Sequence, residues 1–376
     1  MKPLWIGVFW VCAGTIAYVY LGYPLMMALW ARLAPRPHKR AECFPSISLI
    51  VPAHNEAACI VEKLRSSLAL SYPPQKLEIL VATDGSTDGT EQLAASLRDP
   101  RIRVLHHAKR LGKAAAIARA VTSARGDLLV FTDANATLCA DALLQLVRHF
   151  ADSTVGAVGG AKRVRGANGE GLYWRYENAL KEWESAVGSV MGVPGELWAM
   201  RRELYEPLPV DTILDDWAAS MRLVAQGWRV IHASDATAYE APPASLRASW
   251  ERRVRMAAGG WQGVLRLCHP TQFTSLIAWW QCMSHRSLRW MAVPWLWAPM
   301  AIASVALASH PFYLAASLLQ WILYDMAFVG GLLASRGTTR PGVTAAFYLV
   351  FTNAAAAMGA YRYLTGKQPA AWRKAR

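Results

Sequence analysis

The sequence is poor in charged residues. Asp, Glu, Lys and Arg make up only 18% of its 376 residues, whereas hydrophobic residues make up 54%. That hydrophobic share is high for a soluble enzyme and low for a pure transporter. The composition argues against both classes and favours a catalytic domain joined to membrane segments.

Acidic residues are scarce relative to basic ones, and no recognisable nucleic-acid-binding motif accompanies the basic surplus. Lys and Arg number 40 against 26 Asp and Glu, which gives a formal net charge of +14. Many of the basic residues flank apolar stretches, which is typical of membrane topology and of contact with anionic lipid. We therefore expect a bilayer, and no nucleic acid, as the partner of Arg32, Arg36, Lys39, Arg40, Arg362, Lys367, Arg373, Lys374 and Arg376.

Cysteine is rare, and no two cysteines form a CxxC pair. The 6 cysteines lie at positions 12, 43, 59, 139, 268 and 282. We expect reduced thiols in a cytosolic domain rather than a disulfide framework. Cys268, His269, Cys282 and His285 lie near one another in the sequence. Their spacing matches no common zinc-ligand pattern, so we expect no zinc site there.

Long apolar runs occur in the N-terminal and C-terminal parts of the chain. Residues Leu4–Trp30 would form a helix about 40 Å long at about 1.5 Å per residue, which suits one tilted membrane span and is too long for a signal peptide. The basic residues that follow place its C-terminal end inside. Further spans are predicted at Trp290–Ala308, Phe312–Ala334 and Val343–Tyr361.

These spans leave a conflict over topology. One span before the central region and three after it would put the C-terminus outside, whereas the basic tail beyond Tyr361 prefers the inside. Asp325 lies near the middle of one span, where a carboxylate is costly and suggests a functional site by default. We favour the simpler alternative, that Asp325 joins two helices with Asn353 as its partner.

The central region, residues 40–243, alternates short β-branched runs with helical patterns. Continuous apolar strands separated by helices predict a parallel α/β sheet covered on both faces, with ligands bound beyond the carboxyl ends of the strands. No GxGxxG follows the first strand, which disfavours an oxidoreductase. The predicted strands are Ile47–Val51, Leu77–Thr83, Ile102–His106 and Asp127–Thr132, with helices at Ala57–Leu70 and Gly112–Ala124.

Residues 244–289 show a different pattern. Apolar residues recur every three or four positions from Leu246 to Val264, with arginines on the other faces. This predicts an amphipathic helix that lies either in the membrane surface or against the soluble domain, and the sequence leaves both open. The expected organisation is a transmembrane helix (1–33), a catalytic domain (40–243), interfacial helices (244–289) and a C-terminal membrane region with a basic tail (290–376).

Two polar motifs follow the first two predicted strands. VPAHNE occupies 51–56, and TDGSTDGT occupies 83–90. Asp84 followed by Gly85 makes a tight turn with exposed N–H groups, which suits a ribose or base edge with a phosphate beside it. Alone, the second motif could be a turn and helix cap. Its pairing with the first motif favours nucleotide binding.

Two further motifs supply carboxylates. Asp133 and Asn135 follow the fourth strand with one residue between them, a spacing that suits a hard divalent cation completed by water and substrate oxygens. The alternative there is an Asx turn. Asp215 and Asp216 precede a helical pattern, and burial of adjacent carboxylates raises one pKa, as a general base requires. The alternative is a favourable charge at a helix N-terminus.

In sequence order, these motifs resemble the family-2 glycosyltransferases, which have the GT-A fold, a mostly parallel sheet covered by helices. The resemblance runs from about Ser46 to Leu267 and includes GELWAMRRE at 195–203 and an arginine-rich helix. SHRSLRWMAVP at 284–294 also resembles the segment before the C-terminal membrane helices of bacterial synthases of the cellulose, hyaluronan and poly-N-acetylglucosamine type.

The resemblance implies a role for each matching residue. Asp216 would be the general base with Asp215 beside it, and Asp133 and Asn135 would bind Mg²⁺ or Mn²⁺. A single base without an enzyme nucleophile implies one displacement, and hence inversion at the anomeric carbon. The residues implied in nucleotide-sugar binding are Pro52, Asn55, Glu56, Asp84, Gly85, Lys113, Asp133, Arg252 and Arg255.

The chain departs from the family pattern at informative positions. Asn135 replaces the second Asp of the usual DxD motif, which removes one charge from the metal site. Arg252 and Met256 replace the Gln and Trp of the QxxRW motif of chain-extending synthases. Arg255 remains and suits a diphosphate. The missing Trp removes a stacking platform for an acceptor sugar and argues against processive extension.

The expected function is transfer of a sugar from a nucleotide diphosphate donor, with a UDP-sugar expected, to a membrane-associated acceptor in cell-surface glycan synthesis. The alternative is a lipid glycosyltransferase with a polyprenyl phosphate, hopanoid or ceramide-like acceptor. A non-catalytic scaffold is disfavoured because its acidic positions would be eroded. We expect a multi-pass protein of the bacterial inner membrane with a cytoplasmic catalytic domain, and a homo-oligomer or an export partner stays open. The hypothesis requires Asp84, Asp133 and Asp216 to converge at one sheet edge.

Overall fold

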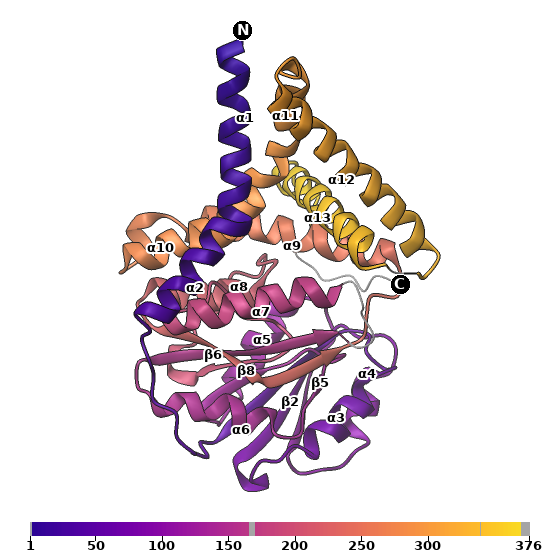
Figure 1. Ribbon diagram of the computed structural model, residues 1–376. Coiled ribbons are helices and arrows are strands. Elements are labelled where there is room, and N and C mark those ends of the chain that lie inside the picture. Colours follow the sequence, from indigo (N-terminus) through magenta and orange to yellow (C-terminus); the bar gives the residue numbers. More distant parts are fainter. Residues whose placement is uncertain (1, 165–169, 339, 370–376) are drawn as a thin grey trace.

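The computed structural model describes residues 2–164, 170–338 and 340–369, without the side chains of 170–174. An α/β domain lies at the bottom of Figure 1, and helices from the N-terminal and C-terminal parts of the chain extend above it. Arg373, Lys374 and Arg376 of the predicted basic tail lie outside the described residues.

The α/β domain is built on one 8-stranded sheet with the order β3-β2-β1-β4-β7-β6-β8-β5. The predicted strands occupy the first half of this order and are parallel to one another. β7 and β5 pair antiparallel with their neighbours, so the sheet is mixed. The strands are β1 (Ile47–Ala53), β2 (Leu77–Asp84), β3 (Ile102–His107), β4 (Leu128–Phe131), β5 (Thr137–Leu138), β6 (Val155–Val164), β7 (Trp198–Arg201) and β8 (Arg229–Glu240).

The central strands are apolar at nearly every position because both faces of the sheet are covered. Every residue of β1 is buried. Leu49 and Val51 belong to the core on one face, and Ile50 belongs to the core on the other, as the two-residue period of a strand requires. The predicted α/β fold with a covered, largely parallel sheet is therefore confirmed.

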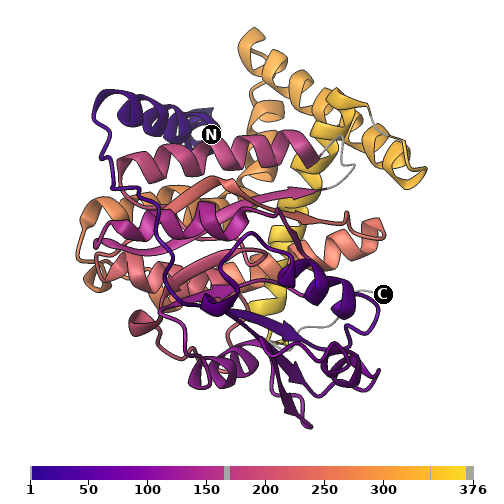
Figure 2. The ribbon, with the colours of Figure 1, turned by 90° about the horizontal axis from the view of Figure 1, so that it is seen from below.

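Helices cover both faces of the sheet (Figure 1). One core contains residues of α3, α4 and α6, and the other contains residues of α5, α8 and α9. Viewed from below, α7 lies beside the indigo N-terminal helix (Figure 2), and it contacts α2. The helix bounds are α3 (Ile60–Leu68), α4 (Thr90–Ala95), α5 (Lys113–Thr122), α6 (Ala142–Val147), α7 (Glu170–Val187), α8 (Asp215–Ala225) and α9 (Leu246–Leu267).

Three helices among the described residues are long and apolar enough to cross a membrane: Lys2–Leu33, Pro311–Ser335 and Pro341–Leu364. The first comprises α1 (Lys2–Ala17), the π-helical turn η1 (Tyr18–Gly22) and α2 (Tyr23–Leu33). The others are α12 and α13. The predicted N-terminal span is confirmed as a long helix.

The predicted span Trp290–Ala308 is not among these helices. α11 (Val293–Ala306) continues directly from the helical residues 283–292, and the predicted span begins among these residues, where Trp290 and Met291 pack on the α/β domain. The preceding helices α10 (Leu276–Cys282) and η6 (Met283–Ala292) pack on the core of the α/β domain. Among the described residues, two helices after the α/β domain, Pro311–Ser335 and Pro341–Leu364, are therefore candidate spans, against the three expected.

The contacts of these helices show where the chain runs. The start of α12 lies beside the N-terminal half of α1, where Trp10 Nε1 donates to the Tyr313 hydroxyl at 3.3 Å. α13 ends against α9, where Arg362 forms an ion pair with Glu251. The chain therefore extends away from the domain beside α1 and returns to it, since the end of α13 lies against α9.

The predicted contact between Asp325 and Asn353 is wrong. The Asn353 side chain donates to the Tyr20 hydroxyl at 3.2 Å and to the Leu349 carbonyl at 2.9 Å. α12 packs on α13 through Gly330, where an added Cβ would overlap the Val343 carbonyl. Asp325 lies five residues before Gly330, on a different face of the helix, and is exposed. Among the residues that the structure describes, no hydrogen bond or ion pair reaches Asp325.

The apolar stripe of α9 packs on protein. Val254 and Ala257 are buried, and an added Cβ at Gly359 of α13 would come within 2.6 Å of the Ala257 Cβ. The Trp250 ring packs edge-on against Phe351 of α13. Of the two alternatives for this helix, the structure supports packing against the rest of the protein, and α13 provides much of the covering surface.

Candidate active site

The loops after β1 and β2 hold each other in place. The Asn55 Oδ1 accepts a hydrogen bond from the Thr87 N–H at 2.8 Å, and the Glu56 N–H donates to Thr90 Oγ1 at 2.9 Å. Pro52 is buried within β1. An added Cβ at Gly85 would come within 2.7 Å of the Arg110 nitrogen, so a side chain there would displace the neighbouring loop. The two motifs therefore form one structural unit.

Asp84 positions the next loop. Its carboxylate is only 4% exposed and accepts hydrogen bonds from the Leu111 N–H at 3.0 Å and the Gly112 N–H at 2.7 Å. Gly112 has φ +100°, a conformation that favours glycine. This turn starts α5 at Lys113, so Asp84 acts on the site through the placement of Lys113.

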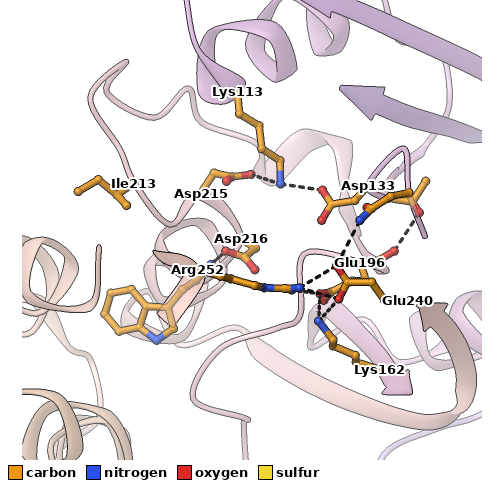
Figure 3. A network of polar contacts seen from close by, with 12 residues as sticks. Lys113, Asp133, Lys162, Glu196, Ile213, Asp215, Asp216, Glu240 and Arg252 are labelled. Atoms are coloured by element: carbon orange, nitrogen blue, oxygen red, sulfur yellow. Dashed lines mark hydrogen bonds and ion pairs between the residues drawn. The ribbon is translucent and has the colours of Figure 1, made fainter. Parts of the chain in front are cut away.

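Lys113 connects acidic residues from two distant parts of the chain. Its Nζ lies 2.9 Å from Asp133 Oδ1, after β4, and 3.5 Å from Asp215 Oδ2, at the start of α8 (Figure 3). Burial alone would lower the Lys113 pKa, but attraction by Asp133, Asp215 and Asp216 raises it above its usual range. Lys113 is therefore a permanent cation facing several carboxylates.

Asp216 has the environment of a base. Its Oδ1 accepts a hydrogen bond from the Trp217 N–H at 2.8 Å. An added Cβ at Gly195 would lie 3.0 Å from its Oδ2, so the backbone there forms a close wall. Burial and the negative charge of Asp215 raise the pKa of Asp216 to about 7, against the attraction of Lys113. A carboxylate with this pKa both binds and releases a proton near neutral pH.

Asp133 and Asn135 offer oxygen ligands at the end of β4. Asp133 is 30% exposed and touches Lys113 through Oδ1. The Asn135 amide donates to Glu240 Oε1 at 3.3 Å. In the described parts of the chain, no group of three His, Cys, Asp or Glu could hold a metal on its own. One carboxylate and one amide fit a hard cation whose remaining ligands are water and diphosphate oxygens.

The two predicted arginines of α9 face different partners. Arg252 NH1 donates to both Glu240 oxygens at 2.8 and 2.9 Å, and NH2 donates to Glu196 Oε1 at 2.9 Å. Arg255 donates to the Ile213 carbonyl at 3.0 Å, and its buried Nε has no hydrogen-bond partner in the described structure. Arg255 is therefore the arginine with donor capacity left near Asp215 and Asp216.

Sequence reasoning missed the residues behind Arg252. Lys162, in β6, is 4% exposed and contacts the same two glutamates as Arg252, Glu196 and Glu240 (Figure 3). Burial would raise the Glu196 pKa, but Lys162 and Arg252 hold it below its usual range. A lysine directly after the small and apolar residues 155–161 of β6 was the available signal. Glu196 lies within GELWAMRRE, and Glu240 ends β8.

Lys63 also escaped notice in the sequence. Its Nζ donates to Thr132 Oγ1 at 2.7 Å and to the Ala136 carbonyl at 2.7 Å, so it ties both ends of the turn that carries Asp133. Burial lowers the Lys63 pKa to about 7, against the attraction of Asp133. Lys63 lies three positions after Ile60 and one before Leu64, on the buried face of α3, and this helical spacing was the available signal.

The hypothesis of convergence is supported by these contacts. Asp84 sets the turn that begins α5, and Lys113 at its start contacts both Asp133 and the Asp215–Asp216 pair. Cys268 and Cys282 are free thiols with sulfur atoms 2.9 Å apart. A cation, an oxygen-ligand pair and a base with a raised pKa therefore share one sheet edge.

Comparison with known proteins identifies this domain. Residues 48–208 match the family model described as "Glycosyl transferase family 2". A mannosyltransferase of Pyrobaculum calidifontis, solved with GDP-Man and Mn²⁺, is 27% identical with a TM-score of 0.75, and the match covers 97% of this chain and 99% of that one. The chain is thus similar to family-2 glycosyltransferases over residues 48–208 and shares the GT-A fold, as the resemblance predicted.

Curated relatives include enzymes with two kinds of product. Poly-beta-1,6-N-acetyl-D-glucosamine synthase of Staphylococcus aureus is 26% identical over 275 residues, covering 70% of this chain and 65% of the relative. Beta-monoglucosyldiacylglycerol synthase of Trichormus variabilis is 27% identical over 260 residues, covering 65% and 55%. The chain therefore spans less than two thirds of the length of these relatives.

Proposed function

We propose that the protein is an inverting glycosyltransferase that transfers a sugar from a nucleotide diphosphate donor to a membrane-associated acceptor. The observation that carries this proposal is the contact of Lys113 with Asp133 on one side and with the Asp215–Asp216 pair on the other. It brings a site for a leaving diphosphate next to a base with a raised pKa. The family-2 domain and the solved relative support the same reaction class.

Donor binding is assigned to the loops after β1 and β2 together with Lys113 and Asp133. The Asn55–Thr87 and Asp84–Gly112 hydrogen bonds give these loops one shape, which would receive the nucleoside. Lys113 and Arg255 would face the diphosphate, where charge-assisted hydrogen bonds to phosphate oxygens are strong. Asp133 and Asn135 would hold Mg²⁺ or Mn²⁺, which would neutralise the negative charge of the leaving group.

The chemical step is a single displacement with Asp216 as the base. The Asp216 carboxylate removes the proton of the acceptor hydroxyl while that oxygen forms a bond to the anomeric carbon. The bond between this carbon and the diphosphate oxygen breaks, and the nucleoside diphosphate leaves. Attack from the face opposite the leaving group inverts the anomeric configuration. Asp215 keeps the Asp216 pKa raised by its charge.

We assign the acceptor to cell-surface glycan synthesis, with a glycolipid acceptor as the second candidate. Residue 256 favours addition of one sugar over chain extension, since the 40% exposed Met256 offers no ring for stacking. The curated relatives include both a polysaccharide synthase and a glycolipid synthase. The donor is a UDP-sugar in this proposal, and GDP-mannose is the alternative because the solved relative binds it.

The proposed setting is the bacterial inner membrane with the catalytic domain in the cytoplasm. The Lys2–Leu33 helix, α12 and α13 are the candidate membrane helices, and Arg362 and Lys367 at the end of α13 would lie on the cytoplasmic side. The proposed division is a membrane helix at 1–33, a catalytic domain at 40–243, membrane-proximal helices at 244–289 and a membrane region from 290 onward.

Binding and product analysis test the proposal together. Purified protein should gain thermal stability with UDP or GDP only when Mn²⁺ or Mg²⁺ is present, and Asp133→Ala should abolish this gain. Radiolabelled UDP-sugars and GDP-mannose would then be incubated with membranes that contain the protein. Label in the lipid-soluble fraction supports a lipid acceptor, and label in polymer supports the polysaccharide product. Stabilisation without any labelled product, from any donor, would reject the transferase assignment.

A further inference from the structure

A buried polar junction links the membrane-proximal helices to the catalytic domain. Glu184 of α7 is fully buried, and its Oε1 accepts a hydrogen bond from the Tyr23 hydroxyl of α2 at 2.6 Å. The same oxygen lies 2.7 Å from His285 Nδ1 of η6. A buried carboxylate requires such partners, because an unpaired one is strongly unfavourable. The buried Glu184 carboxylate therefore obtains its hydrogen-bond partners from two helices outside the sheet, α2 and η6.

The other oxygen of Glu184 holds a peptide of the catalytic domain. The Met191 N–H donates to Glu184 Oε2 at 3.2 Å, and the Met191 carbonyl accepts from Arg286 Nε of η6 at 2.8 Å. Burial would raise the Glu184 pKa, but the partners His285, Tyr23 and Arg286 lower it. The Met191 peptide is thus fixed between an anion and a cation, so it follows the placement of η6 and α7.

The residue after Met191 is in contact with Trp217. Gly192 has φ +111°, and a Cβ added there would overlap Cδ1 of the Trp217 ring. Trp217 also packs against Gly263 of α9, where an added Cβ would likewise overlap the ring. Trp290 of η6 meets it edge-on at 5.5 Å. The ring is therefore enclosed by the 191–195 segment, α9 and η6.

Trp217 in turn contacts the proposed base. The backbone N–H of Trp217 donates to Asp216 Oδ1 at 2.8 Å, and the Gly195 backbone borders Asp216 Oδ2. A continuous series of hydrogen bonds and packing contacts therefore runs from Tyr23 and His285 through Glu184, Met191 and Trp217 to Asp216. Packed side chains and hydrogen bonds of this kind can carry energetic coupling between distant sites.

We propose that Glu184, with Tyr23 and Gly192, positions the catalytic base, so that sugar transfer depends on how α2 and η6 are seated against α7. The inference rests on the proposed role of Asp216 and extends it. Glu184 does not touch the reacting atoms and is a positioning residue. The same contacts stabilise the fold, so the test must measure the pKa of Asp216 through the pH profile as well as the stability of the protein.

The first test places a methyl group between the Met191 segment and the Trp217 ring. In the full-length protein in membranes, Gly192→Ala should lower kcat on the order of 100-fold, as a displacement of about 1 Å at a reacting group can. KM for the donor and nucleotide affinity should change less than about twofold, because displacement of Trp217 leaves the donor loops intact. The matched control is Gly188→Ala, where an added Cβ meets nothing within 4 Å, and its kcat should equal that of the wild type.

The pH profile separates positioning from stability. The hydrogen bond from the Trp217 backbone N–H lowers the Asp216 pKa, so loss of this hydrogen bond raises the Asp216 pKa further. Asp215, Lys113, Glu196 and Arg255 are the other charged groups that face Asp216. The acid limb of kcat/KM should therefore move to higher pH in Gly192→Ala and stay in place in Gly188→Ala.

A second variant covers the outcome in which Gly192→Ala fails to fold. Tyr23→Phe keeps the ring in the same space and removes only the hydroxyl, and it should lower kcat on the order of fivefold, with a smaller shift of the acid limb in the same direction. Wild-type kcat and an unchanged limb in Tyr23→Phe would overturn the inference, as would Gly192→Ala that folds and behaves like Gly188→Ala.

Failure of the inference differs from failure of the proposed function. Full turnover in Asp216→Asn would reject the proposed base and the inference built on it. An inactive Asp216→Asn, together with wild-type kinetics in Tyr23→Phe or in a folded Gly192→Ala, would reject the positioning role alone.

Discussion

Two clusters of charge lie side by side in the site, and they differ in balance (Figure 3). In the first, Lys113 faces Asp133, Asp215 and Asp216. In the second, Lys162 and Arg252 face Glu196 and Glu240. The first has an excess of negative charge and a raised Asp216 pKa, whereas the second is neutral as a group and largely buried.

This difference separates groups suited to chemistry from groups suited to structure. An unbalanced cluster leaves charge that a ligand, a cation or a proton can neutralise. In a balanced buried cluster each charge already has a partner, so its removal mainly costs stability. We therefore expect substitutions in the first cluster to lower activity and substitutions in the neighbouring second cluster to lower stability.

The largest effect is expected at the base. Asp216→Asn keeps the shape of the side chain and cannot accept the proton, so kcat should fall about 1,000-fold, within the usual range for a general base. Thermal stability and nucleotide binding should stay near those of the wild type. Steady-state transfer assays beside thermal unfolding would measure both. A stable Asp216→Asn variant with more than a tenth of wild-type kcat would contradict the assignment.

Substitutions in the balanced cluster should lower the free energy of unfolding. Lys162→Met leaves Glu196 and Glu240 paired with Arg252 alone, and unfolding free energy should fall by about 3 kcal/mol, as for other broken buried ion pairs. Denaturant unfolding in detergent would measure this loss. Lys162→Arg retains the charge and serves as the control. An equally stable Lys162→Met protein with lost activity would place this cluster in the chemistry instead.

Activity should depend on pH through Asp216. The base works only when deprotonated, so kcat/KM should fall about tenfold per pH unit below about pH 7. Asp215→Asn removes a negative neighbour, lowers the Asp216 pKa and should move the acid limb to lower pH. Rate profiles between pH 5 and pH 9, on the order of eight points each, would show the shift. An acid limb that stays in place in Asp215→Asn would refute the coupling between the two carboxylates.

The smallest effect is expected at an exposed pair outside both clusters. Arg266 and Asp211 contact each other at 2.6 Å with side chains 40% and 55% exposed. Because solvent screens such pairs, Arg266→Ala should change unfolding free energy by less than about 0.5 kcal/mol. Comparison with Lys162→Met in the same assay would show that burial decides the difference. A loss similar to that of Lys162→Met would disprove it.

Local patterns predicted the first half of the sheet well. β1 to β4 read as apolar runs followed by turn residues, and their observed bounds differ from the predicted ones by at most two residues at either end. β6 contains glycines and a buried lysine, and β7 is short, so neither has the strand pattern that periodicity detects. Their place in the sheet depends on pairing between distant segments.

For the site residues, too, local motifs identified the residues but not their distant partners. The positions of Asp84, Asp133 and Asp216 in recognisable motifs made them candidates, but their partners could not be read from the motifs. Asp84 binds backbone N–H groups of the α5 loop, and Arg252 binds two glutamates from other strands. Glu184 has no motif at all, since an acidic residue in a helix is ordinarily exposed.

The membrane helices show where helix-by-helix reasoning stops. Hydropathy identified the long spans correctly, because a bilayer selects for length and apolar composition. It also counted Trp290–Ala308 as a span and paired Asp325 with Asn353. Which face of a helix is buried depends on the neighbour that the helix packs on. Gly330 packs against Val343 of α13, and this contact leaves Asp325 on a face turned away from α13.

By itself, the sequence determined the kind of sheet, the apolar helices and the identity of the acidic motifs, because strand period, hydropathy and turn chemistry act over a few neighbouring residues. Only the tertiary structure decided which charges meet. Lys113 and Asp216 are separated by about a hundred positions, and Tyr23 and Glu184 by 161. Burial then gave those pairings their strength, since it removes the water that would otherwise screen them.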